Sequence, residues 1–392
     1  MKLVKVKFRG LGPIPETDWL KVQGNLSLIH APEGPKREAI ATALESLNPP
    51  YRCRDVQPFG ELPRLIRHNG HLRTVNPHKR TIMLGVYDSD PALVAELVAI
   101  SPLLFETDLI EVGRRLDYSR WINFIELASS TRWSEIAERV NHLRATAEEA
   151  IDGERGLFRR LGDLKPTDRV KGALMRDLSA WVERQGARQP AGQESLDELH
   201  HLIRRAESFS AARQLVQRRL PLSIVLSLEP SSTPIAASNQ AEPGTPPQTM
   251  LTRLVTTLEE RLTGESEPVR RQLLAAGNRA CRQDGGSPRL TAAWQRSRLT
   301  LSFRDAADRE VPLESLPAPD RVQVAGRQLI ALITTIWGVR PIVVLPLPEQ
   351  PVSVGCAQEL AANGKALAQV SQCFCVGDMD RYFPGEPQLE IE

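Results

Sequence analysis

The sequence predicts an α/β protein in which a sheet-and-helix domain carries an inserted helical region. A run of β-branched residues from Pro341 to Leu345 is typical of a strand buried on both faces of a parallel sheet. A short apolar strand, Leu26 to Ile29, is followed by a loop that contains proline and glycine and then by a helix from about Glu38 to Leu47. From Ser134 to about Leu220 the chain is rich in Arg and Glu, and its apolar residues recur at helical spacing. We expect this last stretch to be the insertion.

Length and composition are those of an ordinary globular protein with one large domain or two smaller ones. The chain has 392 residues, of which 41% are hydrophobic and 25% are charged. Its net charge of +2 excludes a general affinity for nucleic acid, so any basic patch has to be local. Lysines interrupt the first ten residues, which argues against a secretory signal, and no window is apolar enough to span a bilayer. We therefore expect a cytoplasmic protein without a membrane partner.

The cysteines and histidines do not form a metal-binding pattern. Cys373 and Cys375 would lie on one face of a strand, where they are expected to be small core side chains. His68, His71 and His78 lie in a loop without a partner cysteine, so they are weak zinc candidates. We expect neither a metal nor a cofactor. The cysteine number is odd and the positions are dispersed, as in a reducing compartment: Cys53, Cys281, Cys356, Cys373 and Cys375.

The N-terminal region, 1–130, is predicted to be one lobe of the main domain. Lys2 to Phe8 alternates lysine with apolar residues, which predicts a half-exposed strand. Thr81 to Tyr87 is a second strand of this lobe. Asp90 to Ile100 is predicted to be a helix, because Asp caps a helix and Pro fits its first turn. The aromatic residues of Glu111 to Leu127 are expected to pack into a core.

The remaining boundaries follow from changes in composition. We place the helical insertion at 131–230, a flexible linker rich in Pro and Ser at 231–247, and the returning helix and C-terminal lobe at 248–392. The predicted elements of these regions are a strand at Leu222–Leu228, helix from Gln248 to Arg282 with a break at Gly264–Pro268, a strand at Leu299–Arg304, a polar turn at Asp305–Glu310, a helix whose apolar residues run from Val324 to Ile336, a helix at Cys356–Ala368 and a strand at Gln369–Val376. No element is assigned to the tail, 384–392.

The order strand, turn, helix, buried strand resembles the C-terminal lobe of the RecF/SMC family of ABC-type ATPases. The early strand, loop and helix stand where a P-loop belongs in such proteins, and the resemblance covers about 1–47 and 252–383. It implies an ABC-ATPase-head-like, P-loop NTPase-like fold, with the helical region inserted between the two halves of the head.

The loop that resembles a P-loop has lost most of its phosphate-binding groups. A working P-loop reads Gly-x-x-x-x-Gly-Lys-Ser/Thr, so that backbone amides surround the phosphates and a hydroxyl holds magnesium. Here Ala31 takes the place of the first glycine, Gly34 fits the common family form and Lys36 stands for the lysine. The second glycine is deleted or replaced by Pro35, which removes an amide, and Arg37 and Glu38 replace the hydroxyls. The alternative is a plain loop before an amphipathic helix.

The other two nucleotide motifs are also degenerate when the resemblance is carried over residue by residue. At the buried strand's end, the magnesium-binding aspartate falls on Pro346 and the catalytic glutamate on Leu347, while Glu349 comes two residues late. Gly377 stands where the family has its switch histidine. The signature segment has lost its serine and both glycines, so its phosphate contact in trans is predicted to be weak or absent: Leu316, Pro317, Ala318, Pro319, Asp320 and Arg321.

These features favour a non-catalytic SMC/RecF-like head that serves as a structural or DNA-engaging subunit of a protein complex in DNA repair, chromosome maintenance or defence against foreign DNA. Two other hypotheses stay open. One is a divergent ATPase whose site is completed by a partner subunit, and the other is an unrelated α/β interaction protein. In the first hypothesis no residue is catalytic, and the expected partner is another protein or a second copy of this chain.

Duplex DNA is a second expected partner, bound weakly and without sequence preference. The expected contacts are two arginine pairs of the helical region, Arg204 with Arg205 and Arg218 with Arg219, because phosphate binding needs several cations on one surface. The alternative is that these arginines pair with nearby acids and only solvate a helix. The acids are Glu194, Glu198 and Glu207.

Overall fold

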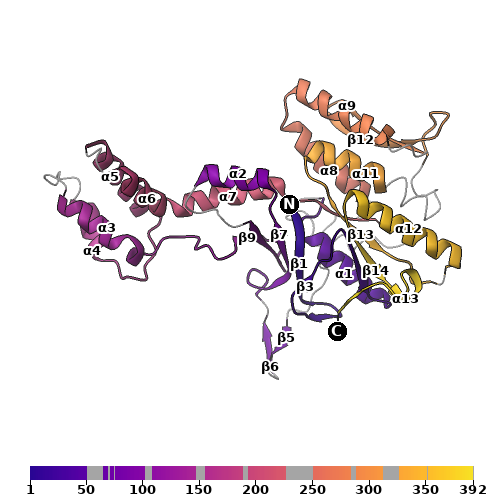
Figure 1. The fold of residues 1–392 in the computed structure, drawn as a ribbon, viewed down its shortest axis with the longest axis horizontal. Helices are drawn as coiled ribbons and strands as arrows, with labels where there is room; N and C mark the ends of the chain where they lie inside the picture. The colour runs from indigo at the N-terminus through magenta and orange to yellow at the C-terminus, as the bar shows by residue number, and fades with distance from the viewer. Residues whose placement is uncertain are drawn as a thin grey trace. The chain divides into compact units, whose positions relative to one another are not determined.

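The computed structural model, drawn in Figure 1, divides into two compact units. Unit 1 comprises Met1–Asp88, Glu111–Trp121 and Arg219–Glu392, and unit 2 comprises Ser89–Ile110 and Ile122–Arg218. The structure describes residues 1–50, 65–68, 71–74, 76–101, 108–146, 155–188, 193–226, 250–283, 288–311, 326–350 and 352–391.

One sheet of unit 1 is built around the N-terminal strand β1 (Lys2–Leu11), which pairs antiparallel with β7 (Thr81–Asp88). The order is β2-β1-β7-β8-β9, with β3 also paired to β1, and β8 and β9 continue into unit 2. In β1 the apolar side chains are buried and the lysines are more exposed, which confirms the predicted half-exposed strand. The other strands are β2 (Ile14–Glu16), β3 (Leu20–Lys21), β8 (Leu109–Arg115) and β9 (Arg120–Phe124).

The second sheet of unit 1 is parallel throughout, in the order β10-β13-β14-β4-β15. Its central strands are buried on both faces, as predicted from the β-branched run. Cys373 and Cys375 are fully buried in the core on one face of this sheet, which confirms their predicted role as core side chains. The strands are β4 (Leu26–His30), β10 (Ser223–Val225), β13 (Ile342–Pro346), β14 (Gln372–Gly377) and β15 (Leu389–Glu390).

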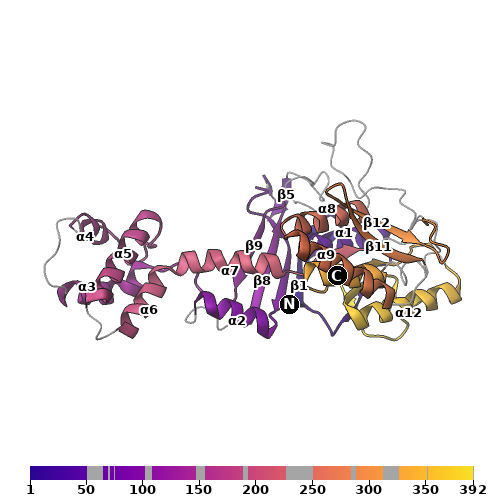
Figure 2. The ribbon, with the colours of Figure 1, turned by 90° about the horizontal axis from the view of Figure 1, so that it is seen from above.

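Helix α1 (Gly34–Ser46) packs against strands of both sheets and so lies between them. The core on the opposite face of the parallel sheet is formed with α8, α9, α11, α12 and the hairpin β11–β12. Figure 2 shows α8, α9 and α12 together with the hairpin. These elements are α8 (Met250–Thr263), α9 (Glu267–Gln283), β11 (Arg289–Gln295), β12 (Arg298–Arg304), α11 (Arg327–Trp337), α12 (Val354–Val370) and the short α13 (Met379–Tyr382).

Unit 2 is mainly helical. The predicted cap of α2 is confirmed, because the Asp90 side chain accepts a hydrogen bond of 2.9 Å from the N–H of Leu93. A separate core joins α3 to α6, with Phe158 and Trp181 in edge-to-face contact at 5.1 Å between ring centres. The helices are α2 (Pro91–Ile100), α3 (Trp133–Thr146), α4 (Arg155–Gly162), α5 (Gly172–Arg188), α6 (Gln193–Ile203) and α7 (Arg205–Arg219), whose last residue belongs to unit 1.

The predicted fold class is confirmed: an α/β, ABC-head-like arrangement in which a strand, a helix and a buried parallel strand occur in the expected order. Several strands were not predicted: β2, β3, β8, β9, β11, β15 and the hairpin β5–β6, whose residues His68 and His71 were expected to lie in a loop. The strand at 299–304 is present, but β11 pairs with it as a hairpin, and β15 in the tail adds an edge to the parallel sheet. The predicted linker, 231–247, lies outside the described residues, as do the side chains of the hairpin β5 (Leu65–His68) and β6 (His71–Thr74). Among the described helices none could cross a bilayer.

A buried ion pair joins α1 to α8. Arg253 Nη2 lies 3.4 Å from Glu45 Oε1, and the two side chains are 8% and 1% exposed. Burial raises the pKa of Glu45 above its ordinary value, and the nearby Arg253 partly opposes that rise. Because the folded-state pKa is raised, folding becomes less favourable as the pH rises from the ordinary value through the raised one.

We predict that Glu45→Ala lowers the free energy of unfolding by about 3–5 kcal/mol, because Arg253 is then buried without its partner carboxylate. The double variant Glu45→Met/Arg253→Met should recover most of this loss, since apolar replacement of a buried pair is often neutral. Urea unfolding measures both. A loss below about 1 kcal/mol in the single variant would show that the pair is well solvated.

Candidate functional site

The edge formed by the carboxyl ends of β4, β13 and β14 is the natural place for a site. In this parallel sheet β13 and β14 lie on one side of β4, whereas β15 lies on its other side, so the connections that follow β14 and β4 lead toward opposite edges of the sheet. Open parallel sheets bind ligands at such a switch point, outside the carboxyl ends of the strands. The strands end here at His30, Pro346 and Gly377.

The connection from β4 to α1 is too short to surround a phosphate. Only Ala31, Pro32 and Glu33 separate the strand from the helix, and the N–H of Ala31 donates to the Gly377 carbonyl at 2.8 Å. A P-loop places four residues between its two glycines alone. The helix was predicted to begin at Glu38, but it begins at Gly34, so that prediction is wrong by a full turn. The degenerate loop residues Gly34 to Arg37 are the first turn of α1.

The carboxylate of Glu349 lies over this first turn. Arg37 Nη2 is 3.4 Å from Glu349 Oε2, and the Arg37 side chain is buried whereas that of Glu349 is more than half exposed. A Cβ atom on Gly34 would lie only 2.5 Å from the same oxygen, so the glycine allows the carboxylate to approach. A helix N-terminus favours an anion, and here the chain supplies one from the loop after β13.

The remaining contacts of this edge are also made within the chain. Lys36 Nζ donates a hydrogen bond to the carbonyl of Ile391, just beyond β15. Arg381 donates to the Glu349 carbonyl at 3.2 Å. An open cavity of about 260 Å³ lies beside these groups, and it is lined by His30, Pro32, Glu33, Lys36, Glu390 and Ile391.

Strand β13 ends in residues without an acidic side chain, Leu345 and Pro346, and Leu347 follows. Pro346 closes the strand, and Leu347 is a core side chain whose N–H donates to the Val376 carbonyl at 2.8 Å. Gly377 leaves room for Leu347, because a Cβ there would lie 2.9 Å from the Leu347 Cβ. The degenerate signature, 316–321, lies outside the described residues.

Comparison with solved structures finds SMC heads. The Smc head bound to the C-winged helix domain of ScpA matches with a TM-score of 0.43 and 8% identity over 97% of this chain and 91% of that one. An Smc head with an extended coiled coil, bound to the C-terminal domain of ScpA from Pyrococcus furiosus, scores 0.36 at 8% identity over 97% and 90%. The SMC head domain from Thermotoga maritima scores 0.33 at 9% identity over 98% and 93%. No family model and no curated protein matches the chain.

These TM-scores are below 0.5, so the fold assignment rests on the order and direction of the strands. The fold is ABC-head-like.

The four arginines predicted to contact DNA differ in their surroundings. Arg204 pairs with Glu207 at 2.8 Å, as the alternative interpretation expected. Arg205 pairs with Glu135 at 2.7 Å and is only 12% exposed. Arg218 is exposed, and Arg219 is half-buried. Glu198 pairs with Arg139 instead, at 3.1 Å, and the side chain of Glu194 lies outside the described residues.

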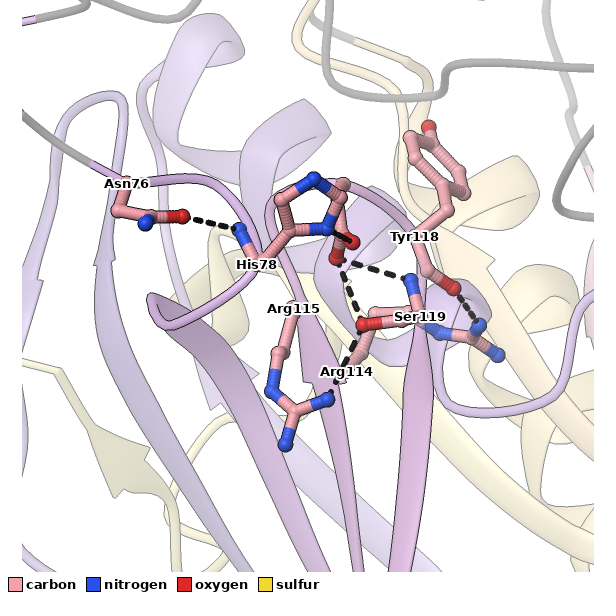
Figure 3. Close-up of polar contacts among 7 residues, drawn as sticks. Asn76, His78, Arg114, Arg115, Tyr118 and Ser119 are labelled. Carbon is pink, nitrogen blue, oxygen red and sulfur yellow. Dashed lines mark hydrogen bonds and ion pairs between the residues drawn. The ribbon is translucent and has the colours of Figure 1, made fainter.

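A second polar cluster surrounds the turn between β8 and β9 (Figure 3). Asp117 accepts hydrogen bonds from the Ser119 hydroxyl at 2.7 Å and from the Ser119 N–H at 3.1 Å, and it also pairs with His78. Tyr118 occupies the left-handed region at φ 71°, and its carbonyl accepts from the buried Arg114. Each polar group in this cluster supports the turn, so we assign it a structural role.

Asp117 makes a pH-dependent contribution to stability. Burial alone would raise the pKa of Asp117, but the hydrogen bonds from Ser119 and His78 outweigh it and hold the pKa below its ordinary value. The stabilisation is therefore present above the unfolded-state pKa and disappears as the pH falls through the lowered one.

We predict that Asp117→Asn lowers the free energy of unfolding by about 1 kcal/mol at neutral pH, because hydrogen bonds to a charged acceptor are weakened. The difference from the wild type should shrink and then vanish as the pH falls from about 4, the ordinary value, through the lowered pKa. Thermal unfolding as a function of pH measures it, and Ser119→Ala should reproduce part of the loss. A deficit that is the same at every pH would contradict this account.

Proposed function

We propose that this chain is a non-catalytic ABC-type head that serves as a structural subunit of a protein complex of the SMC/RecF-like class, in DNA repair, chromosome maintenance or defence against foreign DNA. The observation that carries the proposal is the Glu349 carboxylate over the first turn of α1, paired with Arg37. It occupies the helix end at which a nucleotide phosphate would have to bind.

The electrostatics of this arrangement oppose nucleotide binding. Two unit charges of the same sign at 4 Å repel by about 1 kcal/mol in bulk water and by about 4 kcal/mol near a protein surface. A polyphosphate beside Glu349 would meet this repulsion from each nearby oxygen charge. Lys36, the only cation of the degenerate loop apart from Arg37, is already hydrogen-bonded to Ile391.

The chemistry of phosphoryl transfer lacks its usual groups as well. Hydrolysis requires a metal ion held against the phosphates and a residue that orients the attacking water. At the two positions that the resemblance assigns to these tasks stand Pro346 and the buried Leu347. The divergent ATPase completed by a partner would therefore have to receive both groups in trans.

A head without ATP-driven closure has no switch for pairing, so its association should be constitutive. We propose a protein partner, either a second copy of this chain or a different subunit. Size-exclusion chromatography with light scattering on material from the native host distinguishes a stable complex from a lone monomer.

We predict that calorimetry with ATP and Mg²⁺ gives no binding heat for the purified chain and that no phosphate is released. Lys36→Ala is the control for the loop, and Glu349→Ala tests the carboxylate. Removing Glu349 should not create micromolar affinity, because Pro35 and the three-residue connection still leave no phosphate cradle. Magnesium-dependent micromolar binding that Lys36→Ala abolishes would overturn the proposal.

Engagement of duplex DNA is a second candidate function, favoured by exposed arginines of unit 1. The hairpin β11–β12 packs on α9, where the Asn278 side chain bonds both the N–H and the carbonyl of Ala292 at 2.8 Å. This layer carries five exposed arginines without an acidic partner among the described residues: Arg279, Arg282, Arg289, Arg296 and Arg298. Exposed cations of this kind would supply the phosphate contacts that the net charge cannot.

We predict weak duplex binding without sequence preference, and an affinity that falls steeply with salt. The logarithm of the DNA association constant falls linearly with the logarithm of the salt concentration. In the triple variant Arg279→Glu/Arg282→Glu/Arg289→Glu this slope should become less steep by about 0.9 for each phosphate that is no longer neutralised. Arg204→Glu is the matched control, because Arg204 is already paired with Glu207. Fluorescence anisotropy at several salt concentrations measures this. Loss of binding in Arg218→Glu alone would instead favour the surface predicted from sequence.

A further inference from the structure

Three metal-ligating side chains meet at the switch point of the parallel sheet. His30, Asp378 and Asp380 each offer one ligand atom, and these atoms lie within 4.8 Å of one another. His30 is the last residue of β4 and is paired in register with Gly377, the last residue of β14. Asp378 follows directly, and Asp380 lies in the first turn of α13. Two neighbouring strand ends and one helix therefore hold the cluster.

Each of the two carboxylates has a partner that donates to it or pairs with it. Asp378 Oδ2 lies 3.5 Å from Arg381 Nη2, and the Asp378 carbonyl accepts from the N–H of Arg381 at 3.2 Å. The Asp380 Oδ1 atom accepts from Gln388 Nε2 at 3.0 Å. Metal-ligating carboxylates are usually hydrogen-bonded to donors that orient them. Arg381 also competes with a cation at Asp378, which sets an upper limit on affinity.

The imidazole of His30 supplies an independent observation. Its Nδ1 atom is buried and has no hydrogen-bond partner among the described residues. Buried ring nitrogens in proteins are normally satisfied by a donor, an acceptor or a metal. His30 also lines the open cavity of about 260 Å³ at this edge, together with Glu390, its register partner on β15. A cation coordinated through this nitrogen would satisfy it.

We propose that His30, Asp378 and Asp380 bind one divalent metal ion of the class that includes Mn²⁺ and Zn²⁺. One imidazole and two carboxylates suit such ions, which take nitrogen at about 2.0–2.1 Å and oxygen at about 2.0–2.2 Å. Two ligand atoms on one such ion are about 3 Å apart. The three ligand atoms of this cluster could therefore all bind one ion after each side chain moves by about an ångström. The site is separate from Pro346 and Leu347 and does not depend on the proposed function.

The experiment titrates the full chain with MnCl₂, following free Mn²⁺ by electron paramagnetic resonance, and with ZnCl₂ by calorimetry. We expect one equivalent of ion per chain. Asp378→Asn and Asp380→Asn should each weaken binding more than about 10-fold, since the loss of an outer-shell partner alone costs about 10- to 100-fold. Asp308→Asn is the matched control, because Asp308 is an exposed aspartate paired with an arginine, Arg304, at 3.1 Å.

Circular dichroism and the metal-free melting temperature check that each variant is folded. Metal should raise the melting temperature of the wild type and of Asp308→Asn but not of the two site variants. The proposal is overturned if no stoichiometric ion binds to the wild type. It is also overturned if Asp378→Asn and Asp380→Asn bind as tightly as the wild type.

Discussion

Helix α1 is held at both ends by side chains from distant parts of unit 1, and the arrangement of the two sheets depends on it. At its C-terminus the buried Arg114 donates to the carbonyls of Ser46 and Leu47 at 2.6 and 3.3 Å, where a helix leaves carbonyls without partners. At its N-terminus the carboxylate of Glu349 takes the place of an external anion. Because the helix lies between the sheets, these contacts fix the parallel sheet against the antiparallel one.

The same arrangement supports the proposal that this ABC-like architecture does not require a nucleotide. In a P-loop protein the bound phosphate satisfies the amides at the start of the first helix. Here the loop is shortened to three residues, Pro35 removes an amide, and an internal carboxylate covers the turn. The sheet order, which depends on buried apolar strands, is unaffected by these changes. The sheet order therefore does not depend on the groups that bind a nucleotide in a P-loop protein.

The carboxyl edge of the parallel sheet retains polar chemistry although the nucleotide positions are apolar. Leu347 and Gly377 pack against each other where the resemblance places a glutamate and a switch histidine. One strand away, His30, Asp378 and Asp380 bring an imidazole and two carboxylates together. A switch point concentrates strand ends whatever their sequence, so new ligands can arise there when old ones are lost.

The sequence by itself determined the elements whose signals are local. The alternation of Lys2 to Phe8, the β-branched run of β13 and the Asp90 cap were each predicted correctly, because side-chain periodicity and capping act within a few residues. The start of α1 was predicted a turn late, because Pro and Gly are signals of a loop as well as of a first helical turn.

Only the tertiary structure decided the site. Arg37 and Glu349 are 312 residues apart in sequence, and His30 is brought beside Asp378 only by the pairing of β4 with β14. The strand β15 also escaped prediction, because its two residues carry no periodicity and become a strand only at the free edge of β4. A sequence pattern predicts which side chains of a segment are buried and which are exposed. The order of strands in the sheet decides which other segments those side chains contact.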